Sequence, residues 1–273
     1  MAVLTQEGAL FSQGYDIEIS GTIPVNAGVS SSSALVVAWL RFLIQAQDAS
    51  WEVTDAQIGA WAYQAEVVFF NQPGGLMDQY TIAQGGMIYI DTLKGETTAL
   101  TPKMGTLILA ESGIAKQTLT VLQNARNYAQ NAIEEVKQQH SDFDIHKANE
   151  EDYEKYLPLI SSLYRPYWYA AIHNHSITQK AKQALLEPHP DLEVLGHLMN
   201  AHQKILAQCI QNTPESMIFQ MEAAKQAGAF GAKIIGSGGG GCMVAVTNEK
   251  SKNTVIQAFK EAGAQNAYEV KLT

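Results

Sequence analysis

The sequence predicts an α+β fold with mixed sheets. Segments with the two-residue period of a strand alternate along the chain with segments that have the longer period of a helix, and no internal repeat is visible. The chain has 273 residues, of which 46% are hydrophobic. This length and composition are enough for a full core in one large domain or two ordinary domains.

The first third of the chain predicts one strand and two helices. Residues 16–20 alternate polar and apolar side chains as a half-exposed strand does, and an apolar helix follows over about 32–47. Thr54 begins a second helix, because Gln57 completes a capping box with it, and this helix ends near Asn71. The apolar face of the second helix consists of Ile58, Trp61, Ala62, Ala65 and Phe69.

The middle of the chain predicts two strands, a polar helix and a linker. Two glycines at 85–86 turn into a strand over 87–91, and a second strand covers 106–110. A polar helix runs from about 117 to 139, and the acidic stretch 142–156 is the predicted linker.

The last part predicts further helices and two strands that flank a glycine loop. Helices cover 172–186 and 192–208, and Pro214 sits in the first turn of a third helix that stops at Gly228. The remaining elements are strands at 233–235 and 242–246, a helix at 255–262 closed by Gly263, and a strand at 268–272.

Composition narrows the class of protein. The net charge is −9 and no basic stripe is visible, which argues against a nucleic-acid surface. Cys209 and Cys242 are the only cysteines, so the sequence implies no disulfide framework and fits a reducing compartment. The N-terminus lacks signal-peptide features, and no apolar run reaches the roughly 20 residues that span a membrane. We therefore expect a soluble, cytoplasmic protein with neither nucleic-acid nor membrane partners.

A serine-rich loop is the most informative segment. Pro24 and Gly28 frame a short turn, Ser30–Ser33 follow, and an apolar helix then begins. The first N–H groups of a helix have no partner within the helix, and its dipole favours negative charge there. The loop therefore predicts a phosphate site, most simply for a nucleotide. The alternative is structural, because serine is also a good helix N-cap.

A glycine run, Gly236–Gly241 with Ser237 inside it, lies between two predicted strands. A dinucleotide-binding fingerprint needs a helix after its glycines, and a Walker loop ends in Gly-Lys-Ser/Thr, so neither is present. Such a run is costly in chain entropy and indicates that its backbone approaches something closely. The alternative is a tight turn packed against a neighbouring loop.

Two acidic residues are candidates for site chemistry. Asp78 follows Gly74 and Gly75, which suggests a carboxylate held in a crowded, backbone-lined place, although it could also be a turn or cap residue. Glu66 lies upstream on an otherwise apolar helix segment, where it is either a solvated position or a buried ligand.

Together these segments resemble the GHMP small-molecule kinases, and among them most closely the galactokinases. Residues 24–32 are similar to the family's Pro-x-Gly-x-Gly-Leu-Ser-Ser-Ser loop, and residues 65–66 to its Ala-Glu pair. Residues 75–79 match Gly-x-Met-Asp-Gln, the pattern that favours galactokinase. Residues 231–242 are similar to the closing glycine motif, and residues 195–202 to Gly-x-Leu-Met-x-x-Ser-His.

The resemblance implies a two-domain fold and a set of roles. Residues 1–150 would form an N-terminal, ribosomal-protein-like α+β domain, and residues 151–273 a ferredoxin-like C-terminal sandwich, with the site in the cleft between them. ATP and Mg²⁺ would be the cofactors, with Ser32 and Glu66 as metal ligands and Asp78 as the catalytic residue that orients the acceptor hydroxyl. ATP would contact Pro24, Ala27, Gly28, Val29, Ser30, Ser31 and Ser32. The substrate would contact Gly75, Asp78, Gly236, Ser237, Gly238 and Gly239.

The chain also departs from the family pattern. Asn26 replaces the first glycine of the serine loop, and Glu111-Ser112-Gly113 replaces the Asn-Ser of many galactokinases. The family's first motif, Gly-Arg-x-Asn-x-x-Gly-Glu-His, has no counterpart and would lie upstream of Met1, which makes the N-terminal domain partial. Strand edges left by that segment would favour self-association.

The expected function is therefore ATP-dependent phosphorylation of a small sugar hydroxyl. The alternatives are a kinase for another sugar or for mevalonate, and a catalytically silent homologue or fragment that binds sugar and nucleotide. The presence of Asp78, Glu66 and Ser32 favours the kinase.

Overall fold

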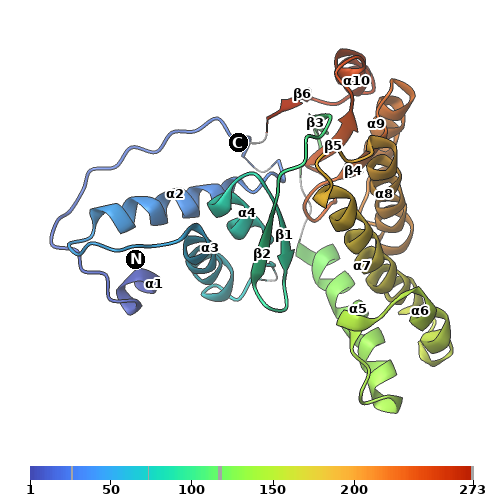
Figure 1. The fold of residues 1–273 in the computed structure, drawn as a ribbon, viewed down its shortest axis with the longest axis horizontal. Helices are drawn as coiled ribbons and strands as arrows, with labels where there is room; N and C mark the ends of the chain where they lie inside the picture. Colours follow the sequence, from blue (N-terminus) through green and yellow to red (C-terminus); the bar gives the residue numbers. More distant parts are fainter. Residues whose placement is uncertain (26, 73, 116–118, 272–273) are drawn as a thin grey trace. The chain divides into compact units, whose positions relative to one another are not determined.

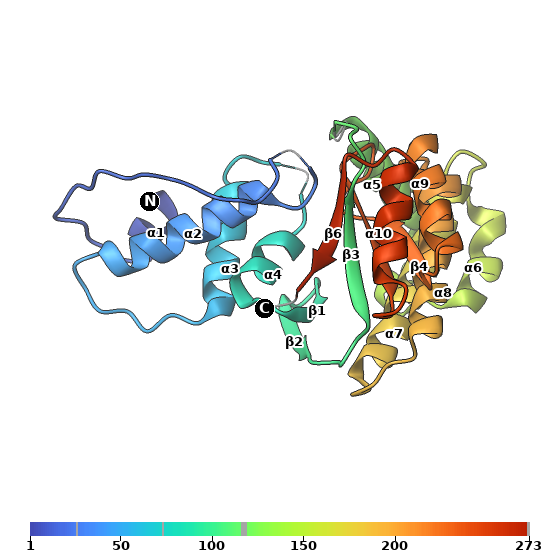
Figure 2. The same cartoon turned by 90° about the horizontal axis from the view of Figure 1, so that it is seen from above.

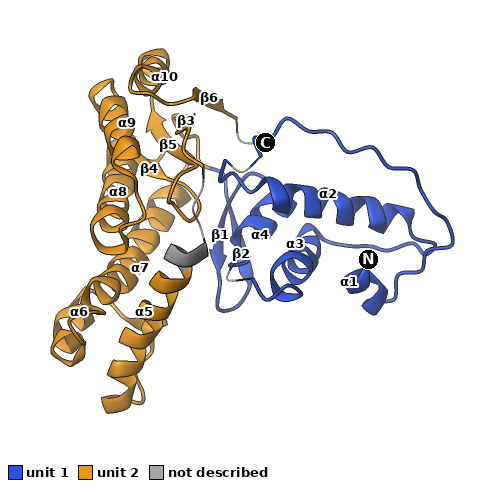
Figure 3. Ribbon diagram, turned by 180° about the vertical axis from the view of Figure 1, so that it is seen from behind, with its two compact units in different colours: residues 1–101, 272–273 blue, residues 102–271 orange. Residues whose placement is uncertain are grey.

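The computed structural model describes residues 1–25, 27–72, 74–115 and 119–271, without side-chain detail for 119–122. The chain divides after Thr101 into two units, residues 1–101 and residues 102–271 (Figure 3). The sequence-based boundary at residue 150 falls inside the second unit, and the division into domains 1–150 and 151–273 stays a prediction.

The first unit is built from helices and one hairpin (Figure 1). Its elements are α1 (Ala2–Gln6), α2 (Ser31–Ala46), α3 (Asp55–Tyr63), the π-helix η1 (Gln64–Val68), α4 (Met77–Gln84), β1 (Met87–Asp91) and β2 (Glu96–Leu100). The side chains of Val37, Leu40 and Leu43 recur at helical spacing and are buried on one face of α2. They pack with Leu4, Ala9, Ile58, Ala62 and Ala83 into one core.

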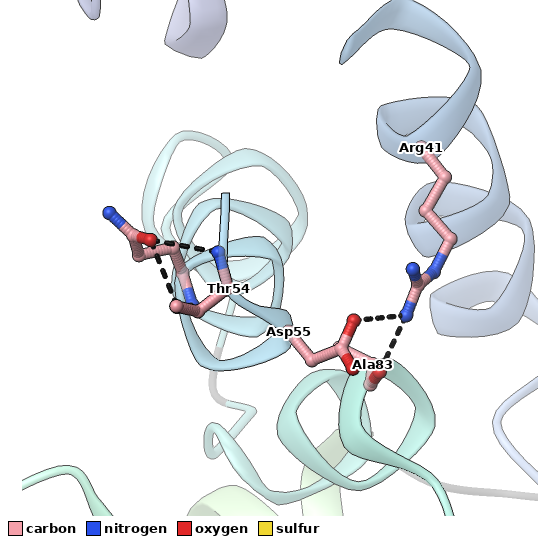
Figure 4. Close-up of polar contacts among 5 residues, drawn as sticks. Arg41, Thr54, Asp55 and Ala83 are labelled. Carbon is pink, nitrogen blue, oxygen red and sulfur yellow. Dashed lines mark hydrogen bonds and ion pairs between the residues drawn. The ribbon is translucent and has the colours of Figure 1, made fainter. Parts of the chain in front are cut away.

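Polar contacts hold the three longer helices of this unit together (Figure 4). The Thr54 hydroxyl accepts from the Gln57 N–H while the Gln57 side chain accepts from the Thr54 N–H, which confirms the predicted capping box. Arg41 on α2 donates to the Asp55 carboxylate at 2.6 Å and to the Ala83 carbonyl at 2.7 Å. One side chain thus ties α2 to the start of α3 and to the last turn of α4.

Two expectations for this unit are wrong. Residues 16–20 form no strand and are exposed, because no described strand lies beside them to pair with their backbone groups. Phe69 is exposed, whereas Val67 is buried. The π-turn η1, with the Phe69 N–H donating to the Gln64 carbonyl, inserts an extra residue and rotates the helix beyond it.

The second unit consists of one antiparallel sheet and two groups of helices. Its strands are β3 (Thr106–Glu111), β4 (Gly231–Ile234), β5 (Cys242–Thr247) and β6 (Asn266–Val270), in the order β4-β5-β3-β6. Every strand pair among the described residues is antiparallel, so the expectation of mixed sheets is wrong. The helices are α5 (Leu119–Gln139), η2 (Ile145–Lys147), α6 (Glu150–Tyr156), η3 (Leu157–Leu159), α7 (Arg165–Leu186), α8 (Leu192–Ile205), the π-helix η4 (Leu206–Ile210), α9 (Glu215–Gln226) and α10 (Lys252–Glu261).

The core of the second unit lies between the sheet and helices α9 and α10, which stand beside it in Figure 2. The fully buried side chains of Ile108, Ile234 and Met243 come from three strands, and those of Met217 and Phe259 from the two helices. The predicted strands around the glycine run are confirmed, as is the helix closed by Gly263. The last strand begins two residues earlier than expected and ends at Val270, while Gln117, Thr118 and Leu272 lie outside the described residues.

The stretch 142–156 is folded, so its assignment as a linker is wrong. Its buried side chains Phe143, Ala148 and Tyr156 pack with Val136 of α5 and with Trp168 of α7. Asn149 caps α6 with a reciprocal bond to Asp152, which explains why an acidic segment forms a helix here.

Helix α8 protects the outer edge of the sheet. The Asn200 side chain donates to the Phe230 carbonyl and accepts from the Ala232 N–H, and Gln203 accepts from the Ile234 N–H. An unpaired sheet edge is a template for association with other chains. These side chains pair the backbone groups of this edge, and α8 covers it. Gly196 and Gly231 allow the close approach, because a Cβ on Gly196 would collide with the Phe230 backbone just before β4, and a Cβ on Gly231 with the Gly196 backbone.

None of the helices in the described part of the chain combines the length and the apolar composition that a membrane crossing requires. The cytoplasmic location stays a prediction.

The edge contact predicts a specific loss of stability. Asn200→Ala should lower the free energy of unfolding by about 2 kcal/mol, since two backbone groups lose their partner. Urea unfolding measures this loss, and the Ala232 amide should exchange faster with solvent. Asn127→Ala, the same truncation at an exposed position of α5, is the control. Equal stability of the two variants would contradict the role of Asn200.

A second prediction concerns pH. Burial, together with the nearby Lys233 amine, lowers the pKa of His202 to about 4. The unfolded chain binds a proton at this imidazole below about pH 6.5, whereas the folded chain does not until about pH 4. The free energy of unfolding should therefore fall as pH drops from 6.5 to 4, by on the order of 3 kcal/mol from this group. Urea unfolding of His202→Gln should show a shallower fall over this window, and an identical slope would refute the assignment.

Candidate functional site

The serine loop leads into α2 through left-handed backbone. Gly28 has φ 79° and Ser30, the residue before the helix, has φ 57°. The Ser30 side chain makes no capping bond to the helix, so the purely structural interpretation of these serines as caps finds no support there. Ser32 is exposed and Ser33 is buried, while Asn26 lies outside the described residues.

A buried glutamine joins the serine segment to the predicted metal ligand. The Gln79 amide nitrogen donates to the Glu66 carboxylate at 2.7 Å and to the Ser33 hydroxyl at 3.2 Å. Gln79 is on α4, Glu66 on η1 and Ser33 in the first turn of α2. Residues from three separate sequence motifs, the serine loop, the pair at 65–66 and the segment 75–79, are therefore in contact.

The packing of α3 against α4 makes this contact possible. Gly59 on α3 lies so close to Tyr80 on α4 that a Cβ would stand 3.0 Å from the Tyr80 Cα. Since η1 continues α3 and Gln79 precedes Tyr80, the same crossing places Glu66 beside Gln79. The absence of a side chain at residue 59 sets the distance between the two helices.

Asp78 lies in the first turn of α4 and is half-buried. This is a position where the helix dipole favours negative charge, so a carboxylate is well placed there. The crowded surroundings expected from the preceding glycines are not found: Gly74 and Gly75 are exposed, and a Cβ on Gly75 would meet no atom within 4 Å. The glycines themselves are therefore not crowded, and the crowded surroundings expected for the Asp78 carboxylate stay a prediction.

In the second unit the glycine run packs against its neighbours. A Cβ on Gly238 would collide with Asn212, and one on Gly240 would stand 2.7 Å from the Ala115 carbonyl. The Gly239 N–H donates to the Asn212 carbonyl at 2.6 Å, and the Gly241 N–H donates to the Ile114 carbonyl at 2.9 Å. The alternative of a turn packed on a neighbouring loop thus accounts for Gly238 and Gly240.

Part of this loop keeps unused hydrogen-bonding capacity. Gly236 is exposed, whereas Gly238 is buried. The Ser237 hydroxyl is buried and has no hydrogen-bond partner among the described residues, and the same holds for the Asn212 side-chain oxygen. The substrate roles of Gly236, Ser237, Gly238 and Gly239 stay a prediction.

A half-buried lysine lies on β4, close to the glycine loop in sequence. Burial lowers the pKa of Lys233 to about 8, and its amine donates to the Ile234 carbonyl at 2.6 Å. No group of three or more His, Cys, Asp or Glu side chains in the described part of the chain could hold a metal by itself. A cation at Glu66 would therefore also need ligands from hydroxyl groups, phosphates or water.

Three residues of these sites were not predicted. Ser33 lies in the serine-rich loop and Gln79 in the segment 75–79, but the sequence pattern does not indicate which serine is buried or that the glutamine contacts Glu66. Asn212 carries no sequence signal, because its role depends on the π-turn η4 and on the left-handed Gln211 before it.

Comparison with known proteins gives matches in both parts of the chain. The model of the GHMP kinases N terminal domain matches residues 1–86, and that of the GHMP kinases C terminal matches residues 181–265. A galactokinase of Streptococcus thermophilus (strain ATCC BAA-491 / LMD-9) is 30% identical over 280 residues, covering 98% of this chain and 69% of the relative. A mevalonate kinase of Thermococcus sibiricus is 27% identical over 264 residues, covering 95% of this chain and 68% of the relative.

Solved structures agree on the fold. The structure of Lactococcus lactis galactokinase complexed with galactose matches with a TM-score of 0.80 at 20% identity, covering 99% of this chain and 72% of that one. The structure of L. major mevalonate kinase in complex with R-mevalonate matches with a TM-score of 0.61 at 22% identity, covering 88% of this chain and 65% of that one. Identities at this level establish a shared architecture and leave the substrate open.

The helix crossing yields a prediction. Gly59→Val should push α4 away from α3 and lower the free energy of unfolding by about 1–3 kcal/mol, as overpacking does. Thermal unfolding measures the loss. Gly14→Val adds the same side chain where no atom lies within 4 Å, and should leave the melting temperature near that of the unsubstituted chain. Equal melting temperatures for both variants would contradict the packing argument.

Proposed function

The chain belongs to the GHMP kinase family, and from this membership we propose that it transfers the terminal phosphoryl group of ATP to a hydroxyl group of a small sugar, as a galactokinase does. The observation that carries the proposal is the segment Gly75–Gln79, whose sequence favours galactokinase and whose Gln79 contacts Glu66. The 30% identity to a galactokinase supports the same substrate class.

The N-terminus of α2 is the proposed site for the ATP phosphates. Backbone N–H groups from Gly28 to Ser31 would donate to the phosphate oxygens, and the uncapped start of the helix leaves such groups available. Pro24, Ala27, Val29 and the hydroxyl of Ser30 complete the proposed contacts.

The Ser32 hydroxyl and the Glu66 carboxylate are the proposed ligands of a magnesium ion. Both are oxygen donors, which Mg²⁺ prefers, and Ser32 is exposed next to the buried Ser33 that shares Gln79 with Glu66. When bound, Mg²⁺ supplies positive charge that offsets the charge of the phosphates. The residues of the chain would position it: Gln79 bonds to Glu66, and Ser32 lies in the first turn of α2.

Asp78 is the proposed catalytic residue. Phosphoryl transfer needs in-line positioning and charge stabilisation more than covalent help. The Asp78 carboxylate would accept a hydrogen bond from the acceptor hydroxyl and take its proton as the bond to phosphorus forms. Gly75 and the loop from Gly236 to Gly239, including Ser237, are the proposed substrate contacts.

A second candidate is mevalonate kinase activity. Mevalonate kinases of two Thermococcus species are 27% and 28% identical over 95% and 96% of this chain, which is close to the value for galactokinases. The two candidates share the phosphate loop and differ in the acceptor alcohol, so an acceptor panel separates them.

The test is ADP release from Mg-ATP with galactose, arabinose, glucuronate, mevalonate or no acceptor. We expect galactose-dependent release, and Asp78→Asn should lower kcat by at least 100-fold while ATP binding is kept, because a proton acceptor contributes roughly 10²–10⁴-fold. Turnover with mevalonate alone would select the second candidate. A folded chain that binds ATP and turns over no acceptor would contradict both and indicate a silent homologue.

A further inference from the structure

We propose that Gln79 is a positioning residue, whose amide nitrogen holds the Glu66 carboxylate in the orientation that presents its second oxygen to a nucleotide-bound Mg²⁺. This inference rests on the proposed function for the presence of the metal. It adds a residue that touches neither metal nor phosphate and acts through the two side chains that it holds, Glu66 and Ser33.

Gln79 forms two hydrogen bonds that fix the Glu66 carboxylate and the start of α2. Its amide nitrogen donates to Glu66 Oε2 at 2.7 Å and to Ser33 Oγ at 3.2 Å, which uses both of its N–H bonds. The two acceptors come from η1 and α2, so one amide fixes two separate segments. Glu66 Oε2 accepts this bond, and Oε1 is the carboxylate oxygen assigned to the metal.

The orientation of the amide is determined by its neighbours. A flipped amide would place Gln79 Oε1 against the Glu66 carboxylate, and two acceptors would then face each other. The side chain is 3% exposed, so water does not relieve that repulsion. The Glu66 carboxylate therefore fixes the amide, and the amide fixes the carboxylate in return.

The arrangement is poor for stability alone. Gln79 Oε1 is buried and has no hydrogen-bond partner among the described residues. A buried unpaired acceptor costs free energy, and an apolar side chain of similar volume would avoid that cost. A glutamine that only filled space would gain nothing from this pattern, whereas a glutamine that orients Glu66 needs its nitrogen at this position.

The experiment compares Gln79→Met with the parent chain and with Gln84→Met. Gln84 is the last residue of α4, accepts from Thr97 at 2.7 Å and likewise has a buried atom without a partner, its Nε2. The same substitution on the same helix therefore serves as the matched control. Binding of Mn²⁺, as a probe for Mg²⁺, is measured by electron paramagnetic resonance with a nonhydrolysable ATP analogue present, and thermal unfolding is recorded for each variant.

We expect Gln79→Met to weaken Mn²⁺ binding by about 10–100-fold, the usual effect of losing a residue that orients a metal ligand. The melting temperature should stay within a few degrees of the parent, and nucleotide binding in EDTA should be unchanged. Gln84→Met should bind Mn²⁺ as the parent does. In steady-state assays the Mg²⁺ concentration for half-maximal rate should rise, while the KM of the acceptor stays the same.

Several results would overturn the inference. Unchanged Mn²⁺ affinity in Gln79→Met, with loss in Glu66→Gln, would leave the proposed metal site intact and refute the role of Gln79. If Gln79→Met does not fold, Gln79→Asn, which keeps the amide but shortens its reach, replaces it; failure of both to fold would show that Gln79 is structural. Absence of Mn²⁺ binding to the parent chain with nucleotide would refute the proposed function as well.

Discussion

The close crossing of α3 and α4 at Gly59 is the constraint on which the first unit depends. A side chain at this position would meet the backbone of Tyr80, so the two helices keep their distance only with glycine there. Gln79 precedes that tyrosine and Glu66 lies on the π-turn that continues α3, so the crossing determines whether the amide reaches the carboxylate. Arg41 reinforces the arrangement by joining α2 to both helices.

The two units share a physical device. In each, a helix ends in a π-turn, η1 or η4, and a residue on or just after that turn supports a candidate site segment. Glu66 lies within η1, and Asn212 follows η4 and binds the backbone of Ser237 and Gly239. A π-turn inserts an extra residue and so changes the direction of the residues that follow it, and such turns are frequent at functional sites.

The sequence predicts correctly those features whose causes lie in neighbouring residues. The capping box at Thr54, the strands around the glycine run and the helix ends at Gly228 and Gly263 depend on neighbouring residues, and all are confirmed. The strand at 16–20 and the exposed Phe69 depend on pairing partners and on a π-turn, which no periodicity reveals. The acidic segment at 142–156 resembled a linker by composition, but its few apolar side chains complete a core with α5 and α7. The motifs place Glu66, Asp78 and Gln79 in the sequence, whereas the contact between Gln79 and Glu66 follows from the packing of helices and is not visible in the motifs.

A crystal structure of the chain with Mg²⁺ and a nonhydrolysable ATP analogue tests the proposed phosphate and metal site most directly. We expect the phosphates at the N-terminus of α2, with the metal between the Ser32 hydroxyl and the Glu66 carboxylate and with Gln79 still bonded to Glu66. A nucleotide bound elsewhere, with the serine loop empty and Glu66 remote from the metal, would contradict it.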